Sequence, residues 1–370
     1  PRGLHGTAYN LYKDRLILTT TLNADMQRYA EAAVKEHMKK LQHEFYSHWE
    51  NREPWYNKPQ VLEQAIQNSP VYLSLKGQGY NEKQIAEIMN RKKAMMVYSA
   101  YQGEASAEMS SIDSIKHYLK ILHPGMIAVE PNSGKIRVWI GDLDYKYFQY
   151  DQVGAPRQVG SVFKPVVYSA AIHNGAQLDA YYKNEQKTYK EYEDWTPRNS
   201  DNDYTGYYTL KGALSKSINT IAVEVLLQTG IEKTIVHARN LGIKSELPQY
   251  PSLALGSADI PLSEMILPYM CFANAGKLMT PYYLLEIRDQ SGTVLYQAPV
   301  PESKEVLPSQ EAYVMSNILS AVINEGTGRR LRTTYGLKNE LAGKTGTTQN
   351  QADGWFIGYN SRIVVGIRVG

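Results

Sequence analysis

The sequence predicts an α/β mixed (α+β) fold in which helices pack on a β-sheet. Residues 15–21 form a run of apolar and β-branched residues that is typical of a strand. Residues 126–140 have the pattern of a hairpin, and residues 355–370 that of two further strands around a turn. The region between about 161 and 285 is mainly helical in pattern. We therefore expect strands from both ends of the chain to share one sheet, with the helices packed on it.

The first elements are the strand over 15–21 and a helix capped by Asn23. Apolar residues recur along this helix at helical spacing: Met26, Tyr29, Ala30, Ala33, Val34, His37, Met38 and Leu41. From about residue 43 to 118 the composition changes, because Trp, Tyr, Gln, Asn and Lys become frequent and prolines interrupt the pattern. We interpret residues 43–118 as an inserted or linker module.

The second half of the chain adds the remaining strands. Apolar segments at 126–129 and 136–140 flank a turn over Pro131–Gly134, and further strands are expected near 284–298 and around Lys344. The chain ends in a strand pattern with nothing after it to cover its faces. We therefore expect the chain to be an internal fragment of a longer protein.

Composition narrows the class of protein. Of 370 residues, 43% are hydrophobic and 21% are charged, which is ordinary for a globular protein with a large core. The formal charge of +3 is too small to indicate a nucleic-acid partner. The single cysteine, Cys271, excludes an internal disulfide, and the eight histidines have no ligand spacing, so we predict no metal and no cofactor. No run approaches the roughly 20 apolar residues that cross a bilayer.

Ser161 and Lys164 form the first candidate catalytic pair. Residues three apart lie on one face of a helix, so Lys164 is placed to take the proton that a serine must lose to become a nucleophile. Pro165 is tolerated only in the first turn, which places Ser161 at the N-terminus of a helix that runs to about residue 174. The positive end of the helix dipole favours an oxyanion there. The alternative is that Ser161 only caps the helix and Lys164 is solvated.

Ser217 and Asn219 form the second candidate segment, at the entry to a helix over about 221–227. The hydroxyl of Ser217 is able to relay a proton between Lys164 and a leaving amine, and the amide of Asn219 is able to hold a peptide carbonyl or to orient Lys164. Alone, Ser-x-Asn is a weak signal, because polar residues are common where helices start.

Lys344 begins the third segment, Lys344-Thr345-Gly346-Thr347. Gly-Lys-Thr also ends the nucleotide-binding P-loop, but the first glycine of that motif would stand at position 338, which is lysine, and a strand follows instead of a helix. On a strand edge, Lys344, Thr345 and Thr347 offer a cation and two hydroxyls to a carboxylate. We expect Gly346 to leave room for a ligand backbone and the N–H of Thr347, with that of Ser161, to form an oxyanion hole.

Together these residues resemble the transpeptidase domain of class A (bifunctional) penicillin-binding proteins. The resemblance covers residues 14–42 and runs almost continuously over 126–370. Besides the three motifs it includes the runs Arg157–Pro165, Trp195–Asn199, Tyr204–Gly206, Leu253–Ser257, Phe272–Lys277, Gly326–Gly328 and Asp353–Tyr359.

The resemblance implies a penicillin-binding-protein/serine β-lactamase-like fold with an antiparallel sheet of about five strands flanked by helices. It divides the chain into a linker over 1–13, a strand and helix leading into the transpeptidase over 14–42, the 43–118 module, and the transpeptidase domain over 119–370, without its C-terminal helix. A glycosyltransferase domain and a membrane anchor are expected to precede these residues in the parent protein. The implied location is the cell envelope, on the extracytoplasmic (periplasmic) side of the inner membrane.

The implied activity is DD-transpeptidation. Ser161 would attack the penultimate D-Ala carbonyl of a peptidoglycan stem peptide, with Lys164 as base, Ser217 as proton relay, and Asn219 and Lys344 completing the site. The amine of a second stem peptide would then take the acyl group. β-Lactam antibiotics would acylate the same serine, and cell-wall synthesis or division proteins are further candidate partners.

Three rival functions share this acyl-enzyme. A class A β-lactamase needs a Glu-x-x-x-Asn loop between the second and third segments, and none of Glu224, Glu232, Glu246 and Glu264 has Asn four residues later. A DD-carboxypeptidase passes the acyl group to water, and a β-lactam sensor or wall-binding module retains it. The last two stay open on sequence alone.

Overall fold

The computed structural model describes residues 9, 10 and 12–370, so most of the predicted 1–13 linker lies outside the described residues. The chain divides into two compact units. The larger unit contains the described residues up to Ala30, together with Pro124–Asp142 and Gln149–Gly370. The smaller unit contains Glu31–His123 and Leu143–Phe148.

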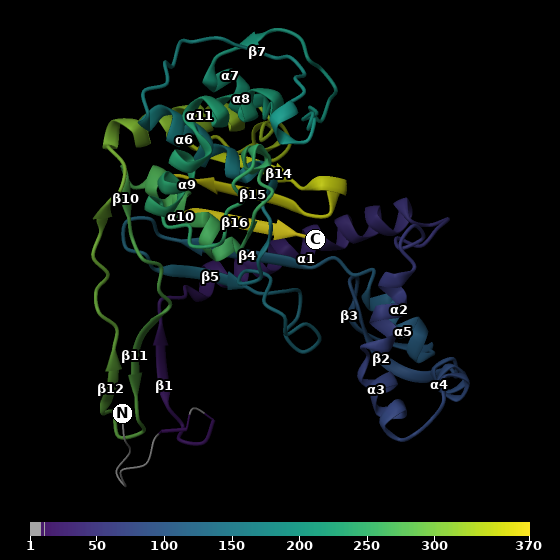
Figure 1. Cartoon of the computed structure of the whole chain (residues 1–370). Coiled ribbons are helices and arrows are strands. Elements are labelled where there is room, and N and C mark those ends of the chain that lie inside the picture. Colours follow the sequence, from purple (N-terminus) through teal and green to yellow (C-terminus); the bar gives the residue numbers. More distant parts are fainter. Residues whose placement is uncertain (1–8, 11) are drawn as a thin grey trace. The chain divides into compact units, whose positions relative to one another are not determined.

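The core of the larger unit is built on a five-stranded antiparallel sheet in the order β14-β15-β16-β4-β5 (Figure 1). Its strands are β4 (Pro124–Val129), β5 (Ile136–Ile140), β14 (Ala342–Thr347), β15 (Gly354–Tyr359) and β16 (Val364–Val369). The predicted α+β class and the antiparallel sheet of about five strands are thus confirmed. Because β14 forms one edge of the sheet, it is paired on one side only.

The expectation that all terminal strands share this sheet is wrong. β1 (Ile17–Thr20), β11 (Leu284–Arg288) and β12 (Val294–Gln297) form a separate three-stranded sheet. All four residues of β1 are exposed, so the strand lacks the buried face that a position in the core sheet requires. Three short strand pairs complete the unit: β6 (Arg157–Gln158) with β9 (Asp259–Ile260), β7 (Tyr182–Lys183) with β8 (Tyr207–Tyr208), and β10 (Lys277–Leu278) with β13 (Lys304–Glu305).

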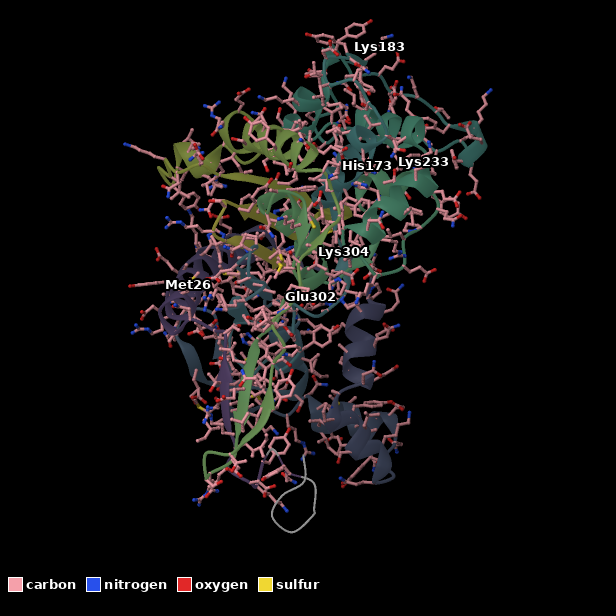
Figure 2. All side chains as sticks on the ribbon, turned by 90° about the vertical axis from the view of Figure 1, so that its left-hand side faces the viewer. Met26, His173, Lys183, Lys233, Glu302 and Lys304 are labelled. Carbon is pink, nitrogen blue, oxygen red and sulfur yellow. The ribbon has the colours of Figure 1, made fainter. Side chains whose placement is uncertain are left out.

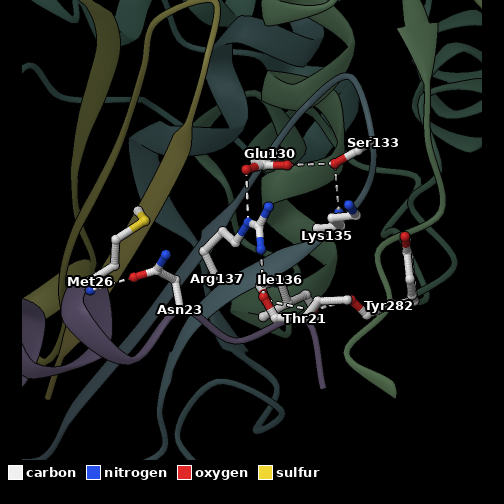
Figure 3. Close-up of polar contacts among 9 residues, drawn as sticks. All are labelled: Thr21, Asn23, Met26, Glu130, Ser133, Lys135, Ile136, Arg137 and Tyr282. Atoms are coloured by element: carbon white, nitrogen blue, oxygen red, sulfur yellow. Dashed lines mark hydrogen bonds and ion pairs between the residues drawn. The ribbon is translucent and has the colours of Figure 1, made fainter. Parts of the chain in front are cut away.

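Thr21 joins the small sheet to the predicted hairpin (Figure 3). Its hydroxyl donates to the carbonyl oxygens of Ile136 at 2.6 Å and Tyr282 at 3.0 Å, and its own carbonyl accepts from Arg137 Nη1 at 2.9 Å. The Nε of Arg137 pairs with Glu130 Oε1 at 2.7 Å across the turn of the hairpin. Thr21 therefore anchors the end of β1 to the hairpin of β4 and β5 in the core sheet.

Each of the five strands of the core sheet contains buried apolar side chains, and helices pack around the sheet (Figure 1). The helices are α6 (Lys164–His173), α7 (Leu210–Lys216), α8 (Asn219–Thr229), α9 (Ile231–Asn240), α10 (Leu262–Ala273), α11 (Ser309–Asn324) and α12 (Arg330–Thr333). Short 3-10 turns lie at Gly160–Phe163, Lys190–Tyr192, Pro251–Leu255 and Gln349–Gln351. Helix α6 is central, because every residue from Lys164 to Ala171 is buried. A helix buried on all sides holds its first residues in fixed positions.

The smaller unit has its own core, formed by Tyr72, Ile85 and Met89. Its elements are α2 (Gln60–Gln67), α3 (Pro70–Gly77), α4 (Glu82–Met89), α5 (Ser111–Tyr118), β2 (Lys93–Ser99) and β3 (Gly103–Met109). The side chains of Asn81 and Ser110 form capping boxes at the starts of α4 and α5.

Helix α1 (Ala24–His48) begins in the larger unit and continues into the smaller one. The prediction that Asn23 caps it is confirmed, because Asn23 Oδ1 accepts from the N–H of Met26 at 2.9 Å. The predicted apolar face is only partly right: Ala30, Val34 and Met38 are buried, whereas Tyr29, Ala33 and His37 are exposed. Within the described part of the chain, no helix combines the length and apolar character needed to cross a membrane.

Candidate active site

The three candidate segments meet where the first turn of α6 packs against the end of β14. Gly160 has a positive φ of 57°, and its N–H donates to the carbonyl of Gly256 at 3.0 Å. A Cβ at Gly160 would lie 2.7 Å from the carbonyl oxygen of Thr347. Only glycine therefore permits both this backbone conformation and this close approach.

Gly346 packs closely against the turn that contains Ser161. A side chain at Gly346 would point into the protein interior, because a Cβ there would lie 2.9 Å from Val162 Cγ1 and 3.1 Å from the carbonyl oxygen of Val159. The expectation that Gly346 leaves room for a ligand backbone stays a prediction. The missing side chain lets β14 pack directly on the turn that contains Ser161.

Lys164 is completely buried, which excludes the alternative in which it is solvated. Its Nζ lies 2.6 Å from the carbonyl oxygen of Ser217, 2.6 Å from Asn219 Oδ1 and 3.2 Å from Ser217 Oγ. Burial, together with the charge of Lys344, holds the pKa of Lys164 well below its ordinary value. The lowered pKa favours the neutral amine, which is the form that a base needs.

Lys344 approaches the same hydroxyl from β14. Its Nζ lies 2.9 Å from Ser217 Oγ and 2.9 Å from the carbonyl oxygen of Thr345. The side chain is completely buried, and burial lowers the pKa of Lys344 to about 7. Ser217 Oγ thus lies between two amines, which is the arrangement a proton relay requires.

Ser217 is held in a strained backbone conformation. It ends α7 with a positive φ of 59°, which residues other than glycine adopt at some cost in free energy. This conformation turns both its carbonyl and its hydroxyl toward Lys164. Helix α8 begins two residues later at Asn219, close to the predicted helix entry.

Ser161 lies in the 3-10 turn over Gly160–Phe163, directly before α6. This agrees with the predicted position at a helix start, and Pro165 occupies the first turn of α6 as expected. The side chain is half-buried, and its Oγ makes no hydrogen bond within the part of the chain that the structure describes. Its hydroxyl is therefore available to a substrate.

Thr345 and Thr347 line the outer side of β14. Thr347 is exposed, and Thr345 Oγ1 lies 2.6 Å from Thr327 Oγ1. Sequence reasoning gave Thr327 no role, although the run Gly326–Gly328 was among the resembling segments. Gly326 packs closely on Ser215, because a Cβ on Gly326 would lie 2.1 Å from the carbonyl oxygen of Ser215. The loop over Gly326–Gly328 therefore contacts both α7, through Ser215, and β14, through Thr345.

No metal site accompanies these residues. Among the described residues, no group of three or more His, Cys, Asp or Glu side chains is placed to hold an ion. Cys271 is buried, and burial raises the pKa of its thiol.

Comparison with protein families identifies two segments. The model described as the penicillin-binding protein transpeptidase domain matches residues 125–365, and the one described as the penicillin-binding protein middle domain matches residues 49–122. Penicillin-binding protein 1A of Aquifex aeolicus is 32% identical over 97% of this chain and 50% of its own length. Penicillin-binding protein 1A of Pseudomonas aeruginosa is 34% identical over 66% of this chain and 36% of its own length. The chain thus spans half or less of the length of these relatives.

Solved structures share the fold. Penicillin-binding protein 1A from Haemophilus influenzae aligns with a TM-score of 0.71 at 20% identity, covering 96% of this chain and 62% of that one. PonA1 from Mycobacterium tuberculosis aligns with a TM-score of 0.67 at 18% identity, covering 98% and 78%. PonA1 in complex with penicillin V aligns with a TM-score of 0.59 at 18% identity, covering 84% and 83%.

Proposed function

Because this chain belongs to the penicillin-binding protein family and contains a class A transpeptidase domain, we propose that it is a peptidoglycan DD-transpeptidase. The observation that carries the proposal is the position of Ser217 Oγ, 3.2 Å from Lys164 Nζ and 2.9 Å from Lys344 Nζ. Together with a free Ser161 hydroxyl at a helix start, this is a complete set of groups for acyl transfer through a serine ester.

Lys164 acts as the base in this mechanism. A neutral amine has two N–H donors and one lone pair, and the two acceptors at 2.6 Å, the carbonyl of Ser217 and Asn219 Oδ1, use both donors. The lone pair is left for the proton of Ser161 as its Oγ bonds to the carbonyl carbon of the penultimate D-Ala. The tetrahedral intermediate then collapses, and the C–N bond to the last D-Ala breaks.

Ser217 returns the proton to the leaving amine. Its hydroxyl gives a proton to the departing nitrogen and regains one from Lys164, with Lys344 donating to the same oxygen. The amine of a second stem peptide then attacks the ester carbonyl and loses a proton to Ser217, which passes one through Lys164 to the departing oxygen of Ser161. A new amide bond thus replaces the old one, and the Ser161 hydroxyl is restored.

The carboxylate and the oxyanion are bound along β14. We assign the terminal carboxylate to the hydroxyls of Thr345 and Thr347, with the buried ammonium group of Lys344 supplying positive charge from below the strand. The oxyanion hole is assigned to the N–H groups of Ser161 and Thr347. The closeness of Gly160 to the carbonyl of Thr347 supports this pairing, because it brings the two segments together at the open edge of the sheet.

For the parent protein we propose a peptidoglycan glycosyltransferase domain, a membrane anchor and an extracytoplasmic location in the cell envelope. Residues 119–370 would then be the penicillin-binding domain, and residues 43–118 would form the module that overlaps the middle-domain match at 49–122. The partners are peptidoglycan stem peptides and β-lactams, and cell-wall synthesis or division proteins are further candidates.

The proposal is tested by intact-mass analysis of the full chain after incubation with penicillin V. We expect one covalent adduct that maps to Ser161, persists for hours and is absent from Ser161→Ala. Rapid loss of the adduct would indicate a β-lactamase, and labelling that survives Ser161→Ala would overturn the mechanism. A stem pentapeptide with an added acceptor then separates the remaining functions: cross-linked dimer supports a transpeptidase, trimmed monomer a carboxypeptidase, and no product a sensor.

A further inference from the structure

Helix α8, which contains Asn219, begins without a cap of its own. The residue before it, Ile218, is apolar and makes no capping hydrogen bond. Instead the N–H groups of Asn219 and Thr220 donate to Asn199 Oδ1, at 2.9 Å and 3.2 Å. An N-cap normally sits directly before its helix, whereas Asn199 lies 20 residues before Asn219. The start of α8 is thus held from outside the helix.

Asn199 is itself fixed by a buried polar network. Its Nδ2 donates to the carbonyl of Asp203 at 2.7 Å and to Asn184 Oδ1 at 2.9 Å. Asn184 Oδ1 also accepts from Thr220 Oγ1 at 2.8 Å. Asn184, Asn199 and Thr220 are only 2%, 6% and 4% exposed. A buried network in which the polar groups are paired is rigid, because losing one bond leaves another group unpaired. Lys183, labelled in Figure 2, marks the segment from which Asn184 enters the network.

Arg198, the residue directly before Asn199, orients the amide of Asn219. Asn219 Nδ2 donates to the carbonyl of Arg198 at 2.7 Å, and Asn219 Oδ1 accepts from Lys164 Nζ at 2.6 Å. The carbonyl of Arg198 therefore sets which end of the amide faces Lys164. If the amide were reversed, its NH₂ group would face an amine whose N–H groups need acceptors.

We propose that Asn199 is a positioning residue for acyl transfer: it caps α8 from outside and so holds Asn219 against Lys164. This inference rests on the proposed function of the same site. Asn199 touches neither substrate nor the reacting atoms and acts through Asn219. The loop that contains Arg198 and Asn199 is thereby part of the support of the site and not only a surface connection.

The test measures the second-order rate constant for labelling of Ser161 by a fluorescent penicillin in the full chain. We expect Asn199→Ala to lower it on the order of 10- to 100-fold, since a small displacement of a supporting group has effects of this size. The control is Thr209→Ala, because Thr209 Oγ1 caps α7 by accepting from the N–H of Gly212 at 3.3 Å and has no bond to Asn219. This control should label at a rate within about twofold of the wild type. An equal loss in both variants would overturn the inference.

A double-mutant cycle separates positioning from general destabilisation. If Asn199 acts through Asn219, then Asn199→Ala should lower the rate little further in a chain that already carries Asn219→Ala. If Asn199→Ala lowered the labelling rate by the same factor in the Asn219→Ala chain as in the wild type, the inference would be overturned. If Asn199→Ala does not fold, Asn184→Ala replaces it in the same cycle, because it removes one hydrogen-bond partner of Asn199. We then expect a smaller loss of the labelling rate constant, and again little further loss in the chain that carries Asn219→Ala.

Hydrogen exchange tests the cap without any ligand. The N–H groups of Asn219 and Thr220 should exchange faster in Asn199→Ala than in Thr209→Ala or the wild type, and equal exchange would overturn the cap. A wild type that penicillin does not label would overturn the proposed function instead. The two failures are therefore distinguishable.

Discussion

At the scale of single residues, the site is defined by two buried lysines that share one hydroxyl. Two ammonium groups this close disfavour each other's charge, and burial disfavours both. Lys164 experiences burial and the charge of Lys344, so its pKa lies well below the ordinary value, whereas burial lowers the pKa of Lys344 to about 7. These pKa shifts support the roles proposed above, in which Lys164 is the neutral base and Lys344 the cation.

This division predicts how acylation depends on pH. Below about pH 7 Lys344 is protonated and its charge attracts a carboxylate, and above it the charge is lost. The second-order labelling constant of the wild type should thus fall by about tenfold per pH unit well above that pKa, as expected for loss of one required proton. Arginine keeps its charge, so Lys344→Arg should label more slowly at pH 7 but lack the decline up to pH 9. A decline of the same shape in Lys344→Arg would contradict the assignment.

The sequence could predict which residues come together in the candidate site but not how they are held. The spacing of Ser161 and Lys164 and the position of Pro165 were enough to place the nucleophile at a helix start. The positive φ of Ser217, the packing role of Gly346 and the cap from Asn199 depend on contacts between segments far apart in the chain. No local pattern encodes such contacts.

At the scale of elements, the turn between β14 and β15 is stabilised by a buried ion pair between Arg368 and Asp353. Arg368 on β16 donates to Asp353 Oδ1 through Nε at 2.8 Å and to Gln152 Oε1 through Nη1 at 2.6 Å. Asp353 closes the turn, because its carbonyl accepts from the N–H of Thr348 at 3.0 Å and its N–H donates to Thr348 Oγ1 at 2.8 Å. The pair thus supports the strand end that contains Thr347.

Removing one partner of this pair should be costly. Arg368 and Asp353 are only 3% and 8% exposed, so Arg368→Ala leaves a buried carboxylate without its cation and should lower the free energy of unfolding by about 3–5 kcal/mol. The control is Arg288→Ala on β11, whose partner Glu286 lies on the more exposed small sheet, and its loss should be far smaller. Urea unfolding of both variants measures the difference. Equal losses would show that the buried pair contributes no more than a surface one.

Strand and helix positions were largely predictable, but the grouping of strands into sheets was not. Alternating and β-branched patterns located the strands at 15–21 and 284–298, yet such patterns specify conformation and not pairing partners. The exposure of β1 and its pairing with β11 appear only when the whole chain is folded. The prediction of an antiparallel sheet of about five strands followed from the resemblance and not from the residues alone.

At the scale of the whole molecule, the chain has two units with separate apolar cores. All the residues assigned to the acyl-transfer site lie in the larger unit, and the core of the smaller one is formed by Tyr72, Ile85 and Met89. Each core should therefore set the stability of its own unit, with catalysis depending on the larger one.

Ile85→Ala tests this separation. Ile85 is 2% exposed, so the cavity left by its side chain should destabilise the smaller unit by about 2–5 kcal/mol. We expect faster hydrogen exchange across residues 60–118, unchanged exchange in the core sheet, and labelling of Ser161 within about twofold of the wild type. The matched variant Ile266→Ala makes the same change in α10, where Ile266 is fully buried in the core of the larger unit. It should give the opposite result, with faster hydrogen exchange in the core sheet and slower labelling of Ser161. Loss of protection throughout the chain in Ile85→Ala would instead show that the two units unfold as one.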